Sequence, residues 1–307
     1  MPAGGRIWSL LLATIAVGLF AHVLLGLAAL ALAALLIASG ASRPLQRALA
    51  GLLAGAGLAF IILRIAPDPV GSAVGAYSLI VAAAFAGGAL LAPVAVARQG
   101  FRALLWGIVG TSVLGLALRG THFWSEVRWG VIHQTSNLVR MVVERWPDSY
   151  PMYEPMVHFL GTAFPGLLAL QTFAALTLAW QWHQLLADAP LGPPVAPFRE
   201  FRFADHWVWG IVGVLMVWAI PRLAALKGVA LNLGLVLSVL YCLRGAAIIV
   251  ALATGAGVPV WALTVATVIA VGLAIPLLLL IPGLWTLGVF DTWLAFRQRS
   301  VGQTTVR

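Results

Sequence analysis

Long apolar stretches alternate with short charged ones along nearly the whole chain. Many stretches without Asp, Glu, Lys or Arg reach 16 residues or more, and a helix needs roughly 20 mainly apolar residues to cross a bilayer core. Several stretches end on an arginine, whose long side chain can reach the headgroups while the helix continues through it. The pattern predicts an all-α, polytopic transmembrane helix bundle of eight or nine spans. The charge-free intervals are 7–42, 48–63, 69–97, 103–118, 155–187, 206–221, 228–243 and 245–290.

The first interval is longer than one bilayer crossing. A single helix over 7–38 would measure about 48 Å at roughly 1.5 Å per residue. It is therefore either one tilted helix or two short helices that meet near His22, and both alternatives stay open. A cleaved signal peptide is rejected, because the apolar sequence continues directly into the next segment.

Glycine and proline divide two other intervals. The Gly-rich run 254–259 ends on a proline and predicts a turn, followed by a final helix from Trp261 towards Phe290. Phe164, Pro165 and Gly166 are expected to open the span that ends near Trp182, since proline favours the first turn of a helix.

Residues 120–153 form the one long polar interval. Apolar residues recur within it at helical spacing, which is typical of an amphipathic helix lying at the membrane interface. A re-entrant segment or a solvated loop helix remains an equal alternative. The residues that set the spacing are Trp124, Val127, Val131, Leu138 and Val142.

Composition excludes a soluble globular protein. Of 307 residues, 62% are hydrophobic and only 9% are charged, against about 25% charged in ordinary soluble domains. The net charge is +9, but the cations are scattered between apolar runs, so we expect no nucleic-acid partner. With a single cysteine, Cys242, there is no disulfide framework. We expect one transmembrane domain over 1–307, ending in a polar tail at 298–307.

Lys and Arg are unequally distributed between the two expected faces of the membrane. If 7–38 is one helix, the face that holds the C-terminus carries 11 of them and the other face 6; if it is two helices, the split is 10 to 7. Loops rich in Lys and Arg stay in the cytoplasm. We therefore expect a multi-pass protein of the bacterial cytoplasmic (inner) membrane, surrounded by membrane lipids, with a cytoplasmic C-terminus.

Arg244 is the most informative charge, because it lies well inside the helix expected to start near Lys227. An ionisable residue at membrane depth is a functional hypothesis by default. Tyr241 lies about 60° from it around the helix and can share a pocket with it, while Asn232 lies about 120° away. The alternative is that Arg244 only snorkels to an interface.

The segment 198–210 alternates aromatic and charged residues just before a span. It is either a ligand-facing loop, in which Arg199 and Arg202 bind an anion, or an aromatic belt in which Asp205 caps the next helix. The belt is the interpretation that the pattern favours.

The C-terminal segment has a similar character. Asp291 and Arg297, with Trp293 between them, can tie the last helix to a neighbour or dock a cytoplasmic partner. A simple stop-transfer role explains Arg297 without either.

Stripes of small residues predict close helix packing. Such stripes let helix backbones approach each other in a membrane, and most are expected to pack within this chain, although some are candidate docking faces for another subunit. We expect Gly55→Leu to damage folding more than Gly302→Leu, since Gly302 lies in the polar tail. The stripes are Ala29 with Ala33; Gly51 with Gly55 and Ala59; and Gly107 with Thr111 and Gly115.

No catalytic pattern is present in the sequence. The six histidines show no HxxxH or HxxE spacing, and there is no GxSxG, Walker A or GxGxxG motif and no intramembrane carboxylate pair. We therefore expect no enzyme activity, no metal and no cofactor.

The motifs within 201–209, 232–245 and 288–297 together resemble those of the YybS-like bacterial membrane proteins. That family looks similar to the substrate-binding S components of energy-coupling-factor transporters, which implies a small-molecule solute held between helices and an energising membrane subunit as partner. The sequence departs from the resemblance at Arg244, where an uncharged amide is expected. The alternative is a structural or scaffolding protein of the cell envelope. The matching residues are Phe201, Arg202, Phe203, Trp207 and Trp209; Asn232, Tyr241 and Gly245; and Gly288, Asp291, Thr292, Trp293, Phe296 and Arg297.

Overall fold

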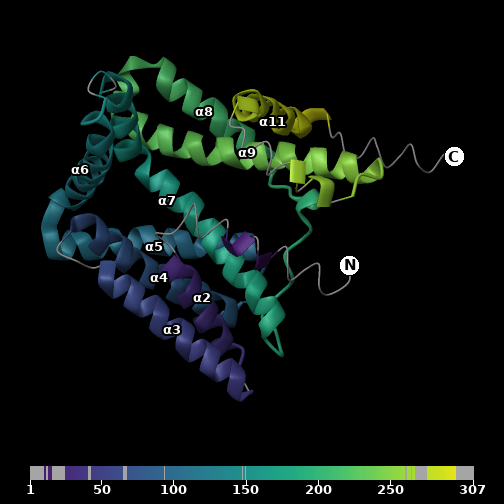
Figure 1. Ribbon diagram of the computed structural model, residues 1–307. Coiled ribbons are helices and arrows are strands. Elements are labelled where there is room, and N and C mark those ends of the chain that lie inside the picture. The colour runs from purple at the N-terminus through teal and green to yellow at the C-terminus, as the bar shows by residue number, and fades with distance from the viewer. Residues whose placement is uncertain are drawn as a thin grey trace. The chain divides into compact units, whose positions relative to one another are not determined.

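The structure, a computed structural model, is built from helices (Figure 1). The part of the chain that it describes contains no strand, so the predicted all-α class is confirmed. The chain divides into two compact units, Met1–Val195 and Ala196–Arg307, which are described in turn. The described residues are 10–11, 13–15, 25–40, 43–64, 68–92, 94–146, 148, 150–259, 261–263, 265–266 and 275–294.

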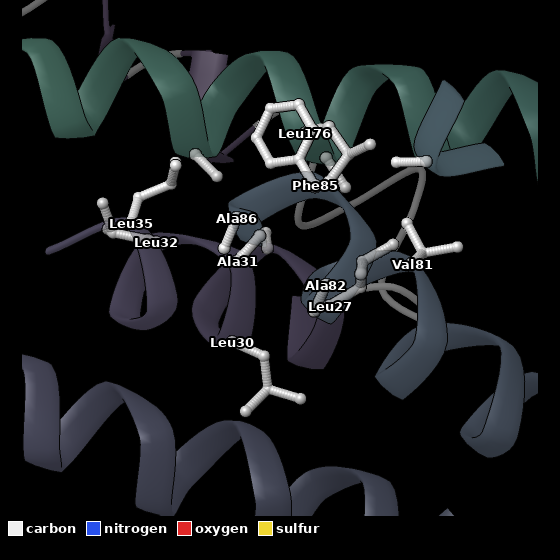
Figure 2. Packing of buried hydrophobic residues seen from close by; sticks show 14 of the residues in the cluster. Leu27, Leu30, Ala31, Leu32, Leu35, Val81, Ala82, Phe85, Ala86 and Leu176 are labelled. Carbon is white, nitrogen blue, oxygen red and sulfur yellow. The ribbon is translucent and has the colours of Figure 1, made fainter. Parts of the chain in front are cut away.

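The first unit is organised around α2, a helix that is apolar on every face. A helix with this composition is stable only when it is surrounded, and α2 packs against α3, α4 and α7. Figure 2 shows leucine and alanine side chains of α2 beside Ala82, Phe85 and Ala86 of α4, with Leu176 of α7 above them. The helices of this unit are α2 (Leu25–Ala38), α3 (Pro44–Arg64), α4 (Pro69–Leu91), α5 (Val96–Arg119), α6 (Phe123–Val143) and α7 (Tyr150–Leu186).

Two specific contacts fix α4 against α7. The rings of Phe85 and Trp180 meet edge to face, with their centroids 5.8 Å apart. The hydroxyl groups of Tyr77 and Thr172 share a buried hydrogen bond of 2.9 Å. Both pairs join residues that are nearly a hundred positions apart in sequence, so they hold the unit together rather than a local turn.

The helix α7 corrects one prediction. It runs unbroken through Pro155 and Pro165, so Phe164–Gly166 does not open a helix. Its 37 residues correspond to about 55 Å, well beyond a bilayer core of roughly 30 Å. Membrane helices tolerate interior proline because neighbouring groups can satisfy the freed carbonyls.

A helix is confirmed within the polar interval 120–153. It is α6, which follows α5 after the short 3-10 helix η2 (Gly120–His122). Val127 and Val131 are buried in the unit, whereas Leu138 is exposed. Whether α6 lies at a membrane interface stays a prediction.

The second unit centres on α9, which packs against α11 and α8. The expected turn at 254–259 is confirmed, since α9 ends at Gly255 and Gly257 has φ +87°, which glycine adopts without strain. The elements are η4 (Phe198–Glu200), η5 (Asp205–Trp207), α8 (Val208–Ala219), η6 (Pro221–Leu226), α9 (Lys227–Gly255) and α11 (Ile275–Leu294).

Four helical runs in the described residues are long and apolar enough to cross a membrane, which agrees with a membrane protein. Two further apolar helices, Gly26–Ala38 and Asp205–Ala219, are shorter than a full crossing. The count of eight or nine spans therefore stays a prediction. The region near His22, Arg297 and the 298–307 tail all lie outside the described residues. The four runs are Pro69–Leu91, Val96–Val143, Tyr150–Leu186 and Pro221–Gly255.

The small-residue stripes have different roles. In α5, a Cβ at Gly107 would overlap the side chain of Val81, and one at Gly115 would overlap the ring of Phe123, so this stripe packs within the chain. No described residue lies within 4 Å of a Cβ placed at Gly51 or Gly55.

No described residue packs against Gly51 or Gly55 of α3, so the alternative of a docking face stays open there, and the described contacts give no reason for Gly55→Leu to be damaging. The glycine of α3 that packs closely against α2 is Gly57. A Cβ added there would lie 2.8 Å from the Leu30 side chain and 3.0 Å from the carbonyl oxygen of Gly26. In α2 itself, Ala33 is buried and Ala29 is half-buried.

We expect Gly57→Leu to destabilise the first unit by about 1–3 kcal/mol, because the new side chain must displace Leu30 and the α2 backbone. Gly55→Leu on the same helix is the matched control and should leave stability near the wild type. Thermal unfolding of the detergent-solubilised variants measures the difference. Equal melting temperatures for both variants would show that α2 and α3 are not in close contact there.

Candidate functional site

Arg244 is the centre of the second unit. Its side chain is fully buried although it belongs to an apolar helix. The guanidinium Nε donates to Oδ2 of Asp291 at 3.0 Å, and Nη1 donates to Oδ1 of Asp205 at 2.8 Å. Arg244 therefore does not extend to the surface of the unit, because its charge is neutralised inside it.

The two carboxylates differ in how deeply they lie. Asp291, on α11, is 4% exposed, so it is a buried partner of Arg244. Asp205, in η5 just before α8, is 43% exposed, and its Oδ2 also accepts from Nη2 of Arg202 at 3.2 Å. Asp205 thus bridges a buried arginine and a half-exposed one, with one oxygen for each.

The electrostatics keep Asp205 charged. Burial acts to raise the pKa of this carboxyl, but the hydrogen bonds and charges of Arg244 and Arg202 outweigh it, so the pKa lies below its ordinary value. Asp205 consequently remains an ionised partner for both arginines at neutral pH.

Aromatic rings line the buried guanidinium. The Phe203 ring lies 5.7 Å from Cζ of Arg244, within the range of a cation–π interaction. The same ring meets Tyr241 edge to face, with centroids 4.9 Å apart. The apolar face of the Phe203 ring therefore lies next to the buried guanidinium of Arg244.

Three polar atoms near this centre lack a hydrogen-bond partner among the described residues. They are Nη2 of Arg244, the hydroxyl of Tyr241 and Oγ1 of Thr292, and all three are buried. The Thr292 hydroxyl lies beside that of Tyr241, but the pair does not reach normal hydrogen-bond geometry. Most buried polar groups in proteins form hydrogen bonds with protein or with ordered water, so these three atoms could bind a small polar ligand.

Two glycines bring α9 and α11 into backbone contact at this centre. A Cβ at Gly245 would overlap the carbonyl oxygen of Leu284, and a Cβ at Gly288 would overlap that of Tyr241. Only glycine permits this approach. Arg244 precedes Gly245 and Asp291 follows Gly288 by three residues, so the close crossing sets the distance of the ion pair.

The structure gathers some of the residues singled out from the sequence and not others. Tyr241, Arg244, Arg202 and Asp291 come together. Asn232 does not join them, since its Nδ2 donates to Gly228 one turn back in the same helix.

The remaining candidates lie away from this centre. Arg199 is exposed and lies 3.7 Å from Glu200, and Trp293 is exposed on α11.

Sequence reasoning missed Asp205 as a partner of Arg244. It suggested a helix-cap role, but no side-chain cap bond is found at the start of η5 or α8. A signal was present: only three acidic residues follow position 196, namely Glu200, Asp205 and Asp291, and a buried arginine needs a carboxylate.

A cavity of about 280 Å³ lies between α6 and α7 in the first unit. Arg140, Tyr150, Glu154 and His158 are among its lining residues. Arg140 is three-quarters exposed and pairs with Glu144 at 2.8 Å, an ordinary surface ion pair. This cavity therefore shows no chemistry comparable with the buried centre at Arg244.

Comparison with known proteins identifies no relative: no protein-family model, no curated protein and no solved structure matches this chain. Within the described ranges, no three His, Cys, Asp or Glu side chains gather in a way that could hold a metal ion. The functional argument therefore rests on the Arg244 centre itself.

We expect Gly288→Ala to weaken the crossing of α9 and α11, because the added methyl meets the backbone of Tyr241, which cannot move aside as a flexible side chain can. Gly283→Ala, on the same helix but with no described residue within 4 Å of the added Cβ, is the matched control. Unfolding in detergent should show a loss of about 1–3 kcal/mol for Gly288→Ala alone. Unchanged stability of that variant would contradict the crossing.

We expect Asp291→Ala to destabilise the protein by about 3–5 kcal/mol, because removing a buried partner leaves the Arg244 charge uncompensated. Asp205→Ala should cost less, since Asp205 is half-exposed and water can replace it. The double change Arg244→Met with Asp291→Leu should recover stability, because no buried charge remains. Additive effects of the two single changes Arg244→Met and Asp291→Leu would rule out coupling of this pair.

Proposed function

We propose that this chain is a multi-pass protein of the bacterial cytoplasmic membrane that binds a small solute within its second unit. In this proposal it serves as the solute-binding component of a transport complex, in the manner of an S component, with its C-terminus in the cytoplasm. The sequence carries no ATP-binding motif, so a partner subunit would supply the energy.

The observation that carries the proposal is the buried, incompletely satisfied Arg244. Taking a guanidinium and a carboxylate out of water costs several kcal/mol for each ion even after relaxation. A purely structural ion pair would recover most of this cost through full hydrogen bonding. Here Nη2 of Arg244 and two nearby buried hydroxyls have no partner among the described residues, so these three groups remain available to hydrogen-bond a polar ligand.

Two further features support a solute site at this centre. Ionisable residues within membrane helices commonly mark substrate pathways. Arg202 and Asp205 are both partly exposed, so they connect the buried guanidinium to the surface of the unit. A solute that reaches this surface would therefore find a continuous chain of polar groups leading to Arg244.

A second candidate function is a scaffold of the cell envelope without a solute. The Arg244 charge is balanced inside the unit, and the backbones of α9 and α11 touch at two glycines, as in a rigid structural crossing. The part of α3 around Gly51 and Gly55 is not covered by any described residue, which suits a docking face for another membrane subunit.

Native mass spectrometry of the gently solubilised protein separates the two functions. The wild type should carry a small-molecule adduct, and Arg244→Gln should lose it while remaining folded, since glutamine still hydrogen-bonds and is less costly to bury. Arg140→Gln, which changes an exposed arginine of α6, is the control and should retain the adduct. A folded wild type that carries only lipid or protein partners would favour the scaffold.

A further inference from the structure

We propose that the solute presents a carboxylate, and that this group replaces Asp205 on the Nη1–Nη2 edge of Arg244. The inference rests on the proposed function, since it names the class of solute bound at the same site. It is based on which nitrogens of the Arg244 guanidinium bind Asp205 and Asp291.

A guanidinium offers two edges, each of which can hold both oxygens of a carboxylate, and the two edges share one nitrogen, Nη2. In this protein Asp291 uses Nε and Asp205 uses Nη1, while Nη2 has no partner among the described residues. Each contact is therefore made through one nitrogen only. A carboxylate lying across Nη1 and Nη2 would form two parallel bonds where Asp205 forms one.

Asp205 is the carboxylate that can leave. It is 43% exposed, whereas Asp291 is 4% exposed and has no comparable access to water. When Asp205 releases Arg244, it still has Arg202 as an ion-pair partner. The exchange thus leaves no buried charge without a partner, which is the main cost of breaking such a pair.

The surroundings indicate the rest of the ligand. The Phe203 ring covers the guanidinium and touches Tyr241, so a flat or apolar body can stack beside the carboxylate. The buried hydroxyls of Tyr241 and Thr292 offer further hydrogen bonds. Small aromatic carboxylates and fatty acids share this chemistry, the first arriving from water and the second from the membrane.

Charge balance predicts how binding responds to mutation. Arg202, Arg244, Asp205 and Asp291 sum to zero, so a carboxylate binds by exchange with Asp205 rather than by attraction to a free cation. Removing the charge of Asp205 should therefore strengthen binding. Removing Arg202 should weaken it, because Asp205 then has Arg244 as its one remaining arginine partner in this group.

Isothermal titration calorimetry of the full chain in a non-ionic detergent tests this exchange, with benzoate and decanoate as probes. Asp205→Asn should bind a carboxylate about tenfold more tightly than the wild type. Arg244→Lys should bind it at least about tenfold more weakly, because an ammonium cannot form the two-pronged contact. Asp188→Asn, which changes an aspartate paired with Arg43 in the first unit, should match the wild type.

The two probes distinguish the sources: benzoate binding that responds to Asp205→Asn indicates a water-soluble carboxylate, and decanoate binding alone indicates a fatty acid. Failure of both probes to bind, or affinities that Asp205→Asn leaves unchanged, would overturn the carboxylate assignment. If the native adduct still depends on Arg244 in that case, the solute-binding function stands and only its chemical class is wrong. If Asp205→Asn fails to fold, Arg202→Gln gives a second readout, since it should weaken carboxylate binding. An affinity that Arg202→Gln leaves unchanged would also overturn the exchange.

Discussion

A guanidinium removed from water must receive both its counter-charge and its hydrogen-bond acceptors from a few side chains, and this requirement determines the second unit. Asp291 can reach Arg244 only because α9 and α11 touch at Gly245 and Gly288. The segment before α8 is held at the same place, since Asp205 supplies the second carboxylate. One buried charge thus fixes a helix crossing and the path of a loop.

The first unit is held together in a different way. Its centre is the apolar helix α2, enclosed by leucine, alanine and aromatic side chains (Figure 2). Polar groups contribute there as isolated pairs, such as Tyr77 with Thr172. A core of this kind tolerates conservative substitution as long as volume is preserved, whereas the Arg244 centre tolerates little, because each group depends on the others.

The local sequence pattern was sufficient to predict the helical class, the turn before Val258 and the helix within 120–153, since these depend on apolar runs, helical spacing and nearby glycine and proline. It did not predict that α7 continues through Pro165, because proline ends a helix unless tertiary contacts satisfy the freed carbonyls. It also placed close packing at Gly55 rather than Gly57. A stripe of small residues shows that a helix can be approached, and not which neighbour approaches it.

The candidate site was predictable only in part, for the same reason. Helical geometry placed Tyr241 near Arg244, but the partners Asp205 and Asp291 lie 39 and 47 residues away, beyond any local pattern. The hydrogen bonds that Asp205 and Asp291 do not make to Arg244 are as informative as those that they make. An unsatisfied buried donor costs about 1–3 kcal/mol, and a centre with only a structural role gains nothing from bearing it. Among the described residues Nη2 of Arg244 has no partner, which agrees with the proposal that this centre exchanges partners and does not merely fasten two helices.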